Sequence, residues 1–353
     1  MPLGDVSSLA LLWALIKALI LITFVLVSAI FFVWLERKVA GRIQDRLGPT
    51  RVGGKFGWLQ TVADGLKLLV KEDLIPAHAD RMLFRMGPYV ALVGAFLAYM
   101  ALPFGNQAVA LEMNVAVFYM LAVLSTEVYG VILGGYGSGS KWALFGAMRE
   151  AAQVVSYEVP RSLCVVIPIL AAGTLNLNEI ARQQVGGFWN WYVFHDPFTF
   201  VAFWVFFTVG TASCKRAPFD LAEAESELVA GFHTEYSGFR WLIFYMAEYG
   251  SMFSVSGIAV LLFLGGWHTG LLPFDLSDRL GLVGNIVNIL VFVVKGWVLV
   301  FVMMWVRWTL PRLRIDQVMM TCLKYLLPLS CALLLGASVW PLVVNTLRIG
   351  WMY

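Results

Sequence analysis

Long apolar segments alternate with shorter polar segments along almost the whole chain. Eight of the apolar segments have roughly the 20 residues that a helix needs to cross a lipid bilayer. They are residues 9–35, 83–103, 113–134, 144–172, 197–214, 239–264, 283–306 and 323–347. The strand-like alternation of an outer-membrane barrel is absent from the sequence. The pattern predicts an all-α polytopic membrane protein with about eight transmembrane helices in a single membrane domain, residues 1–353.

The first polar connection, residues 36–82, is far longer than the usual connection between helices. Glycines and a proline mark turns at 48–49 and 53–54, and apolar residues then recur at helical spacing. These apolar residues are Phe56, Leu59, Val62, Ala63, Leu66, Leu69 and Val70. We expect an amphipathic helix in the membrane interface, either as a brace or as a wall of an access site for an amphiphilic ligand. The preceding segment, 9–35, would be about 40 Å long as a helix, so it should tilt or project beyond the bilayer core.

Lysine and arginine are concentrated in alternate connections. Only 13% of the residues are charged, and nearly all the basic ones lie in 36–85, 135–149, 215–240 and 307–324. The positive-inside rule places these four connections in the cytoplasm and both termini on the periplasmic side. The basic residues flank helices and form no separate domain, so the net charge of +3 gives no indication of nucleic-acid binding.

The sequence carries no metal-binding or nucleophile motif. Its four cysteines lie in or near apolar segments without the spacing of metal ligands. Its four histidines fall in connections, and no catalytic triad, phosphate loop or dinucleotide fingerprint is present. We therefore expect no metal site, no catalytic residues and no redox cofactor on this chain.

The connection 215–240 is unusually acidic for so apolar a chain. Five carboxylates fall within sixteen residues of it: Asp220, Glu223, Glu225, Glu227 and Glu235. An acidic loop between membrane helices is either solvated at the surface or lines a polar cavity that handles protons or a polar ligand.

Ionisable residues also occur inside the predicted transmembrane helices. They include Glu127, Glu150, Glu158, Arg161, Glu248 and Lys295. Each such group costs on the order of 3 kcal/mol at the bilayer centre, so these side chains should face the bundle interior and pair. Glu158 and Arg161, at i and i+3, can pair on one helix face. The set forms either static ion pairs or a proton relay.

Several long blocks of sequence are similar to one known family. The first follows Glu36-Arg-Lys and reads Gly41-Arg-Ile-Gln-Asp-Arg-Leu-Gly-Pro-Thr-Arg, and the second contains Ala152-Gln-Val-Val-Ser-Tyr-Glu. The third is Arg216-Ala-Pro-Phe-Asp-Leu-Ala-Glu-Ala-Glu-Ser-Glu, and Leu310-Pro-Arg-Leu-Arg-Ile-Asp-Gln also fits. Over essentially its full length the chain resembles the membrane component of respiratory complex I (NADH:quinone oxidoreductase) that joins the membrane arm to the peripheral arm.

The resemblance implies an eight-helix subunit that forms most of a chamber for ubiquinone or menaquinone together with hydrophilic neighbours. Flavin and iron–sulfur clusters are expected on those partner subunits, and quinone reduction would drive proton translocation through antiporter-like subunits. The residues implied for the quinone chamber are Arg42, Arg46, Arg51, Asp64, Arg216 and Asp220. The connection 215–240 would be the coupling loop, with Glu223, Glu225, Glu227 and Glu235. The proton path would involve Glu127, Glu150, Glu158, Glu248 and Lys295.

The chain departs from the family pattern in its charges. Many members have a glutamate at the position of Ser213, and this chain instead adds Lys215 nearby. Glu150 stands where the family usually has a small residue, and Glu127 sits two residues from the corresponding acid of some relatives. We hypothesise that Glu127 and Glu150 substitute for the missing glutamate. The alternative is that no proton passes through this part of the complex.

Two other functions remain open at this stage. The chain could be the membrane subunit of a related ferredoxin-dependent or hydrogenase complex, or a stand-alone ion transporter. The sequence has no internal repeat and no pair of broken helices in matching positions, which disfavours the transporter. The lysine-rich first connection is typical of a protein of the bacterial plasma membrane. The electron donor and the type of quinone are not defined by this sequence.

Overall fold

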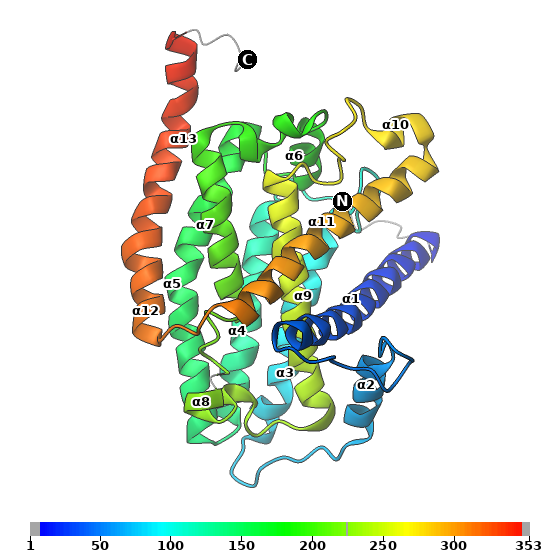
Figure 1. Ribbon diagram of the computed structural model, residues 1–353, viewed down its shortest axis with the longest axis vertical. Coiled ribbons are helices and arrows are strands. Elements are labelled where there is room, and N and C mark those ends of the chain that lie inside the picture. The colour runs from blue at the N-terminus through cyan, green and yellow to red at the C-terminus, as the bar shows by residue number, and fades with distance from the viewer. Residues whose placement is uncertain (1–7, 224, 348–353) are drawn as a thin grey trace.

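The computed structural model describes residues 8–223 and 225–347, in which every regular element is a helix (Figure 1). Seven helices are long and apolar enough to cross a membrane, and α7 is a shorter apolar helix. The shorter helix is α7 (Pro197–Ser213), and the candidate membrane spans are α1 (Ser8–Ile43), α3 (Arg81–Ala101), α4 (Ala116–Gly137), α5 (Lys141–Ala172), α9 (Gly238–Phe263), α11 (Leu282–Thr309) and one more. The last is a continuous run of α12 (Ile315–Met320), the π-helical turn η4 (Thr321–Leu326) and α13 (Leu327–Leu347). The prediction of an all-α polytopic membrane protein is confirmed.

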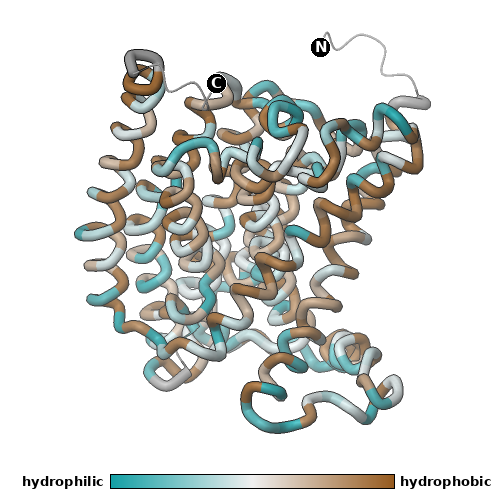
Figure 2. Tube along the Cα trace, turned by 45° about the horizontal axis from the view of Figure 1, so that its top comes forward, coloured by the Kyte–Doolittle hydropathy of each residue, from teal (hydrophilic) through white to brown (hydrophobic). Residues whose placement is uncertain are grey.

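Short helices occupy the two ends of the bundle. Figure 1 shows α2 (Gln60–Val70) and α8 (Glu225–Leu228) at one end, and α6 (Leu177–Gln183) and α10 (Leu276–Leu280) at the other. The 3₁₀ turns are η1 (Phe188–Asn190), η2 (Tyr192–Phe194) and η3 (Gly231–His233). The basic connections therefore gather at the end that carries α2 and α8. Figure 2 shows hydrophobic residues running along the helices, with hydrophilic residues more frequent in the connecting segments.

Helix α9 forms the centre of the bundle. In its most apolar 18-residue window, 94% of the residues are buried, whereas the corresponding fraction for α1 is 33%. Helices α3, α7, α11 and α1 all pack against α9. Figure 1 shows α1 and α11 running obliquely past the more upright α3, α4, α5 and α7. Polar residues within this window of α9 therefore face protein.

Several helix boundaries differ from the sequence prediction, and two of the differences have a clear structural cause. Helix α1 continues to Ile43, well beyond residue 35, because no glycine–proline turn interrupts it before Gly48. The amphipathic helix was predicted to begin at Phe56, but α2 begins at Gln60. Gly57 adopts a left-handed φ of 65°, and a Cβ there would lie 2.4 Å from the Pro49 carbonyl oxygen. The chain must turn at this glycine, so Phe56 lies outside the helix.

Small residues bring α3 and α4 into close contact. Gly87 and Ala91 of α3 face Gly130 and Gly134 of α4. A Cβ placed on Gly130 would lie 2.4 Å from the Ala91 nitrogen, which is backbone that cannot move aside alone. Such small-residue contacts are the usual way in which membrane helices approach closely.

We expect Gly130→Ala to destabilise the bundle by roughly 1–3 kcal/mol, because the added methyl group forces α3 and α4 apart. The thermal unfolding midpoint of the solubilised protein should fall, together with the amount of folded chain in the membrane. Gly250→Ala is the matched control, since a Cβ on this α9 glycine makes only ordinary contacts of 3.7 Å or more. Equal midpoints for the two variants would contradict the prediction.

Candidate functional site

A cavity of about 680 Å³ opens at the end of the bundle that carries α2. Helices α1, α9 and α11 and the segment before α2 form its walls. Its lining residues are Val33, Glu36, Arg37, Ala40, Arg46, Leu47, Gly48, Pro49, Thr50, Arg51, Gln60, Tyr245, Tyr249, Arg307 and Trp308. The volume lies within the range of small-molecule sites, and the lining combines apolar surface with a few converging polar groups.

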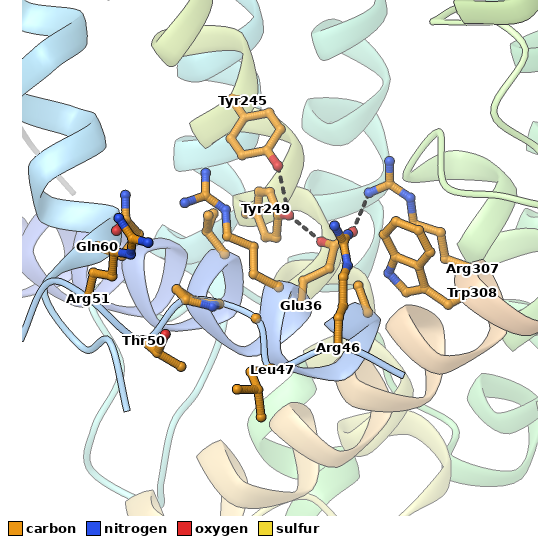
Figure 3. Close-up of a pocket in the computed structure, with 15 residues that line it drawn as sticks. Glu36, Arg46, Leu47, Thr50, Arg51, Gln60, Tyr245, Tyr249, Arg307 and Trp308 are labelled. Carbon is orange, nitrogen blue, oxygen red and sulfur yellow. Dashed lines mark hydrogen bonds and ion pairs between the residues drawn. The ribbon is translucent and has the colours of Figure 1, made fainter. Parts of the chain in front are cut away.

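Glu36 is the polar centre of this cavity. Its side chain is 5% exposed and accepts hydrogen bonds from the Tyr249 hydroxyl and from the Arg307 guanidinium (Figure 3). Arg216 Nη1 lies 3.4 Å from each Glu36 carboxylate oxygen. The Tyr245 hydroxyl lies 3.1 Å from the Tyr249 hydroxyl and extends the network along the cavity wall. The carboxylate is thus held by two cations and a phenol at the cavity edge.

Arg216 carries this network away from the cavity into the bundle. Its Nε lies 2.9 Å from Glu248 Oε1, so the two side chains form an ion pair. The two atoms are not aligned for a hydrogen bond, and Nε has no hydrogen-bond partner in the described chain. The guanidinium also stacks 4.4 Å from the centre of the Tyr249 ring. Arg216 is 2% exposed, so it joins two buried carboxylates on different helices.

A second buried ion pair lies beside the first. Lys215 Nζ donates to Glu127 Oε1 at 2.8 Å, and the Ser251 hydroxyl donates to the other Glu127 oxygen. Lys215 has a left-handed φ of 54°, and the amides of Lys215 and Arg216 bond back to the last turn of α7. This capping turn directs two consecutive cations into the bundle rather than toward solvent.

Glu150 differs from the other buried carboxylates. Its side chain is completely buried in α5, and neither oxygen accepts a hydrogen bond from any described residue. Lys215, Glu127, Glu223 and Asp220 are close enough to affect it electrostatically. Glu150 therefore belongs to the same cluster without a direct partner in it.

The acidic loop folds against this cluster. Burial, reinforced by the charge of Glu223, raises the pKa of Asp220 to about 6. Burial alone would also raise the pKa of Glu223, but the His233 ring 2.9 Å away holds it well below its usual range. At the surface, a hydrogen bond from Arg149 lowers the pKa of Glu227. The loop thus combines a carboxyl group that titrates near pH 6 with carboxylates that stay ionised.

The remaining predicted acidic residues of the loop and of the membrane helices lie outside the two buried ion pairs described above. Glu235 is half-buried before α9, and the side chain of Glu225 lies outside the described residues. Glu158 pairs with Arg161 at 3.6 Å, as their spacing predicted, and Arg161 donates to Ser213 Oγ at 2.8 Å. Glu158 also accepts from Ser125, and it lines an apolar groove of about 350 Å³.

Lys295 is not brought together with the carboxylates. Its ammonium donates to the carbonyl oxygens of Leu264, Gly266 and His268 at 2.6, 3.1 and 2.6 Å. It also lies 4.2 Å from the centre of the Trp191 ring. Leu264 follows α9, sixteen residues beyond Glu248, which corresponds to about 24 Å along a helix. The three donors of Lys295 therefore stabilise the far end of α9.

Three of the six predicted chamber residues line two neighbouring cavities, and the other three line neither. Arg46 and Arg51 line the large cavity, while Asp64 pairs with Arg37 and lines an adjoining cavity of about 340 Å³. Arg42 is exposed and lines neither of them. Asp220 also lines neither cavity, and Arg216 contacts the large cavity through two of its lining residues, Glu36 and Tyr249.

The sequence did not identify four residues as members of the site: Glu36, Tyr245, Tyr249 and Arg307. Glu36 and Arg307 end apolar segments, where a charge is expected anyway, and the two tyrosines are ordinary residues of a membrane interface. Their i, i+4 spacing on α9 was the available signal, since it places both hydroxyl groups on one face. Within the described ranges, no group of three His, Cys, Asp or Glu side chains could hold a metal ion.

The fold and the site together define a class of protein. It is an all-helical membrane protein with a polar cavity at one end and a line of buried charges behind the cavity. A sequence profile described as NADH dehydrogenase matches residues 16–338. The chain is 46% identical to the H subunit of the NADH-quinone oxidoreductase of Anaeromyxobacter dehalogenans, over 93% of this chain and 82% of that protein. It is 44% identical to the protein of the same name from Chlorobaculum tepidum, over 94% and 92% of the two chains. The chain belongs to the NADH dehydrogenase family.

We expect Lys215→Met to destabilise the protein by about 3–5 kcal/mol, because it leaves Glu127 buried without its cation. The double variant Lys215→Met with Glu127→Gln should recover most of that loss, since it removes both charges together. Thermal unfolding of the solubilised protein measures both effects. Lys55→Met is the control, because Lys55 is exposed. A double variant less stable than Lys215→Met alone would contradict the pairing.

Proposed function

We propose that this chain is a membrane-arm subunit of a complex I-type NADH:quinone oxidoreductase, in which it forms much of the quinone chamber. The observation that carries the proposal is the 680 Å³ cavity, whose polar centre is joined through Glu36 and Arg216 to buried carboxylates. A cavity of this kind suits a ligand that gains electrons and protons. Membership of the family supports the same conclusion.

The walls of the cavity fit a quinone headgroup and its tail. Arg46, Arg51 and Arg307 would stabilise negative charge that develops on the carbonyl oxygens during reduction. An apolar cavity of about 240 Å³ between α1, α2 and α9 shares Val33, Tyr245 and Tyr249 with the large one. An isoprenoid tail would lie there and reach the lipid along the amphipathic helix α2, which acts as a wall of the access route.

Electrons would reach the quinone from other subunits. This chain would hold no redox cofactor, and flavin and iron–sulfur clusters would belong to peripheral-arm partners next to the cavity. Antiporter-like membrane subunits would be its other partners. The protein would lie in the bacterial plasma membrane, with the cavity end in the cytoplasm and both termini on the periplasmic side, as the basic connections indicate.

Reduction of a quinone to a quinol takes up two electrons and two protons, so a side chain that gives one of these protons to the quinone is left one unit more negative until it is reprotonated. The acidic loop, with Asp220 titrating near pH 6, would respond to that change. The response would pass to Glu248 through Arg216 and to Glu127 through Lys215. Glu150, which has no hydrogen-bond donor in the described chain, would bind a proton on this path and, together with Glu127, would substitute for the glutamate that this chain lacks at position 213.

Val33→Trp should narrow the chamber, because Val33 is buried and lines both cavities. We expect quinone reduction by the intact complex to fall about tenfold or more, with a raised KM for a long-chain quinone. Reduction of ferricyanide by NADH, which needs only the input subunits, should be unchanged. Val339→Trp on the exposed face of α13 is the control. Normal quinone kinetics in Val33→Trp would remove the chamber assignment.

Glu150→Gln and Glu127→Gln should each lower proton pumping by roughly tenfold, because an amide cannot carry the proton. Pumping is measured as acidification of the lumen of inverted vesicles during NADH oxidation, and divided by the rate of quinone reduction. Glu112→Gln, at an exposed position outside the cluster, is the control. If both variants pump normally, the hypothesis that these residues replace the missing glutamate is wrong.

A further inference from the structure

One cation lies far from the charged cluster, on the outer surface of α1. Lys17 is exposed, and its neighbours Leu15, Leu19 and Ile20 are 68%, 66% and 62% exposed. Such a strongly apolar exposed surface suits contact with lipid acyl chains. A lysine in this position is costly unless its ammonium reaches the headgroup region or meets an anion.

The Lys17 ammonium is only weakly satisfied by the protein. It lies 3.4 and 3.3 Å from the carbonyl oxygens of Val109 and Ala110, at the long end of the hydrogen-bond range. No ion pair joins it to a carboxylate of the described chain. The ammonium can therefore take a stronger, anionic partner.

An apolar cavity of about 340 Å³ lies directly beside Lys17. Leu21 and Phe24 of α1, Phe104 and Ile289 form much of its lining, and Lys17 is its one charged residue. Phe104 is fixed by an edge-to-face contact with Phe24 at 5.0 Å. Backbone hydrogen bonds from Phe104 to Ala108 and from Ala108 to Gly105 hold the loop that forms the other wall. The cavity is thus preformed.

The position of Lys17 along α1 matches the far leaflet. Arg37, at the cavity end of α1, is twenty residues further on, which is about 30 Å along a helix and close to the thickness of the bilayer core. Helix α1 is oblique, so the separation of the two residues across the bilayer is smaller than this length along the helix (Figure 1). A lysine near a helix end extends its flexible side chain so that the ammonium points toward the headgroups.

We propose that this place is a binding site for one anionic glycerophospholipid, whose phosphate pairs with Lys17 while an acyl chain lies in the adjoining cavity. The combination of one cation with an otherwise apolar cavity matches a molecule with one anionic end and a long apolar end. A quinone fits less well, because it has no charge for the ammonium. The site is separate from the quinone chamber, which lies at the other end of α1, and it does not depend on the proposed function.

The test compares the phospholipids retained by the intact assembly after purification in mild detergent and extensive washing, measured by quantitative lipid mass spectrometry. Lys17→Gln should lower the retention of phosphatidylglycerol about fivefold, the equivalent of about 1 kcal/mol for one lysine–phosphate contact. Ala108→Phe should fill the cavity while leaving Lys17 in place, and it should give a similar loss. Lys141→Gln, which removes an exposed lysine outside the cavity, is the control.

Unchanged phosphatidylglycerol in both Lys17→Gln and Ala108→Phe would overturn the proposal. An equal loss of phosphatidylethanolamine and phosphatidylglycerol in Lys17→Gln would also overturn it, since the cation would then not select the lipid. Retention of quinone in place of phospholipid, lost in Ala108→Phe alone, would assign the cavity to a different ligand. Subunit composition by gel electrophoresis confirms that each variant assembles before its lipids are compared.

Discussion

The need to neutralise charge inside the membrane dominates this structure. Glu36, Glu127 and Glu248 are each 5% exposed or less, and each is balanced by Lys215, Arg216 or Arg307. A lone buried ion is costly in a low-dielectric interior, so each of these groups constrains where its partner's helix can lie. Helices α1, α4 and α9 are therefore joined by charge to the turn after α7, and α11 is joined in the same way to α1.

The turn after α7 makes this arrangement possible in a chain with few charges. Two adjacent cations enter the bundle and reach carboxylates on three different helices. The same turn begins the acidic loop, so the cavity, the loop and the buried carboxylates are connected over a short path. A change of charge at any of them alters the electrostatic potential at the others, because low dielectric screens little.

The sequence predicted those features of the structure that depend on residues close together in the chain. The apolar length of each helix and the i, i+3 pair of Glu158 and Arg161 are of this kind. The centre of the site was not predictable, since Glu36 and Arg216 are 180 positions apart and meet only through helix packing. The start of α2 was missed because the close approach of Gly57 to the segment at 49 is also a tertiary contact.

The burial of α9 has a consequence for how this chain can change over evolutionary time. Within its buried 18-residue window, α9 has almost no outward-facing position where one apolar residue can replace another freely. The run that ends in α13 is the opposite case, with 17% of its apolar window buried within the chain. Sequence drift should accordingly be slow along all faces of α9, and the outer face of α13 should vary freely except where another subunit covers it.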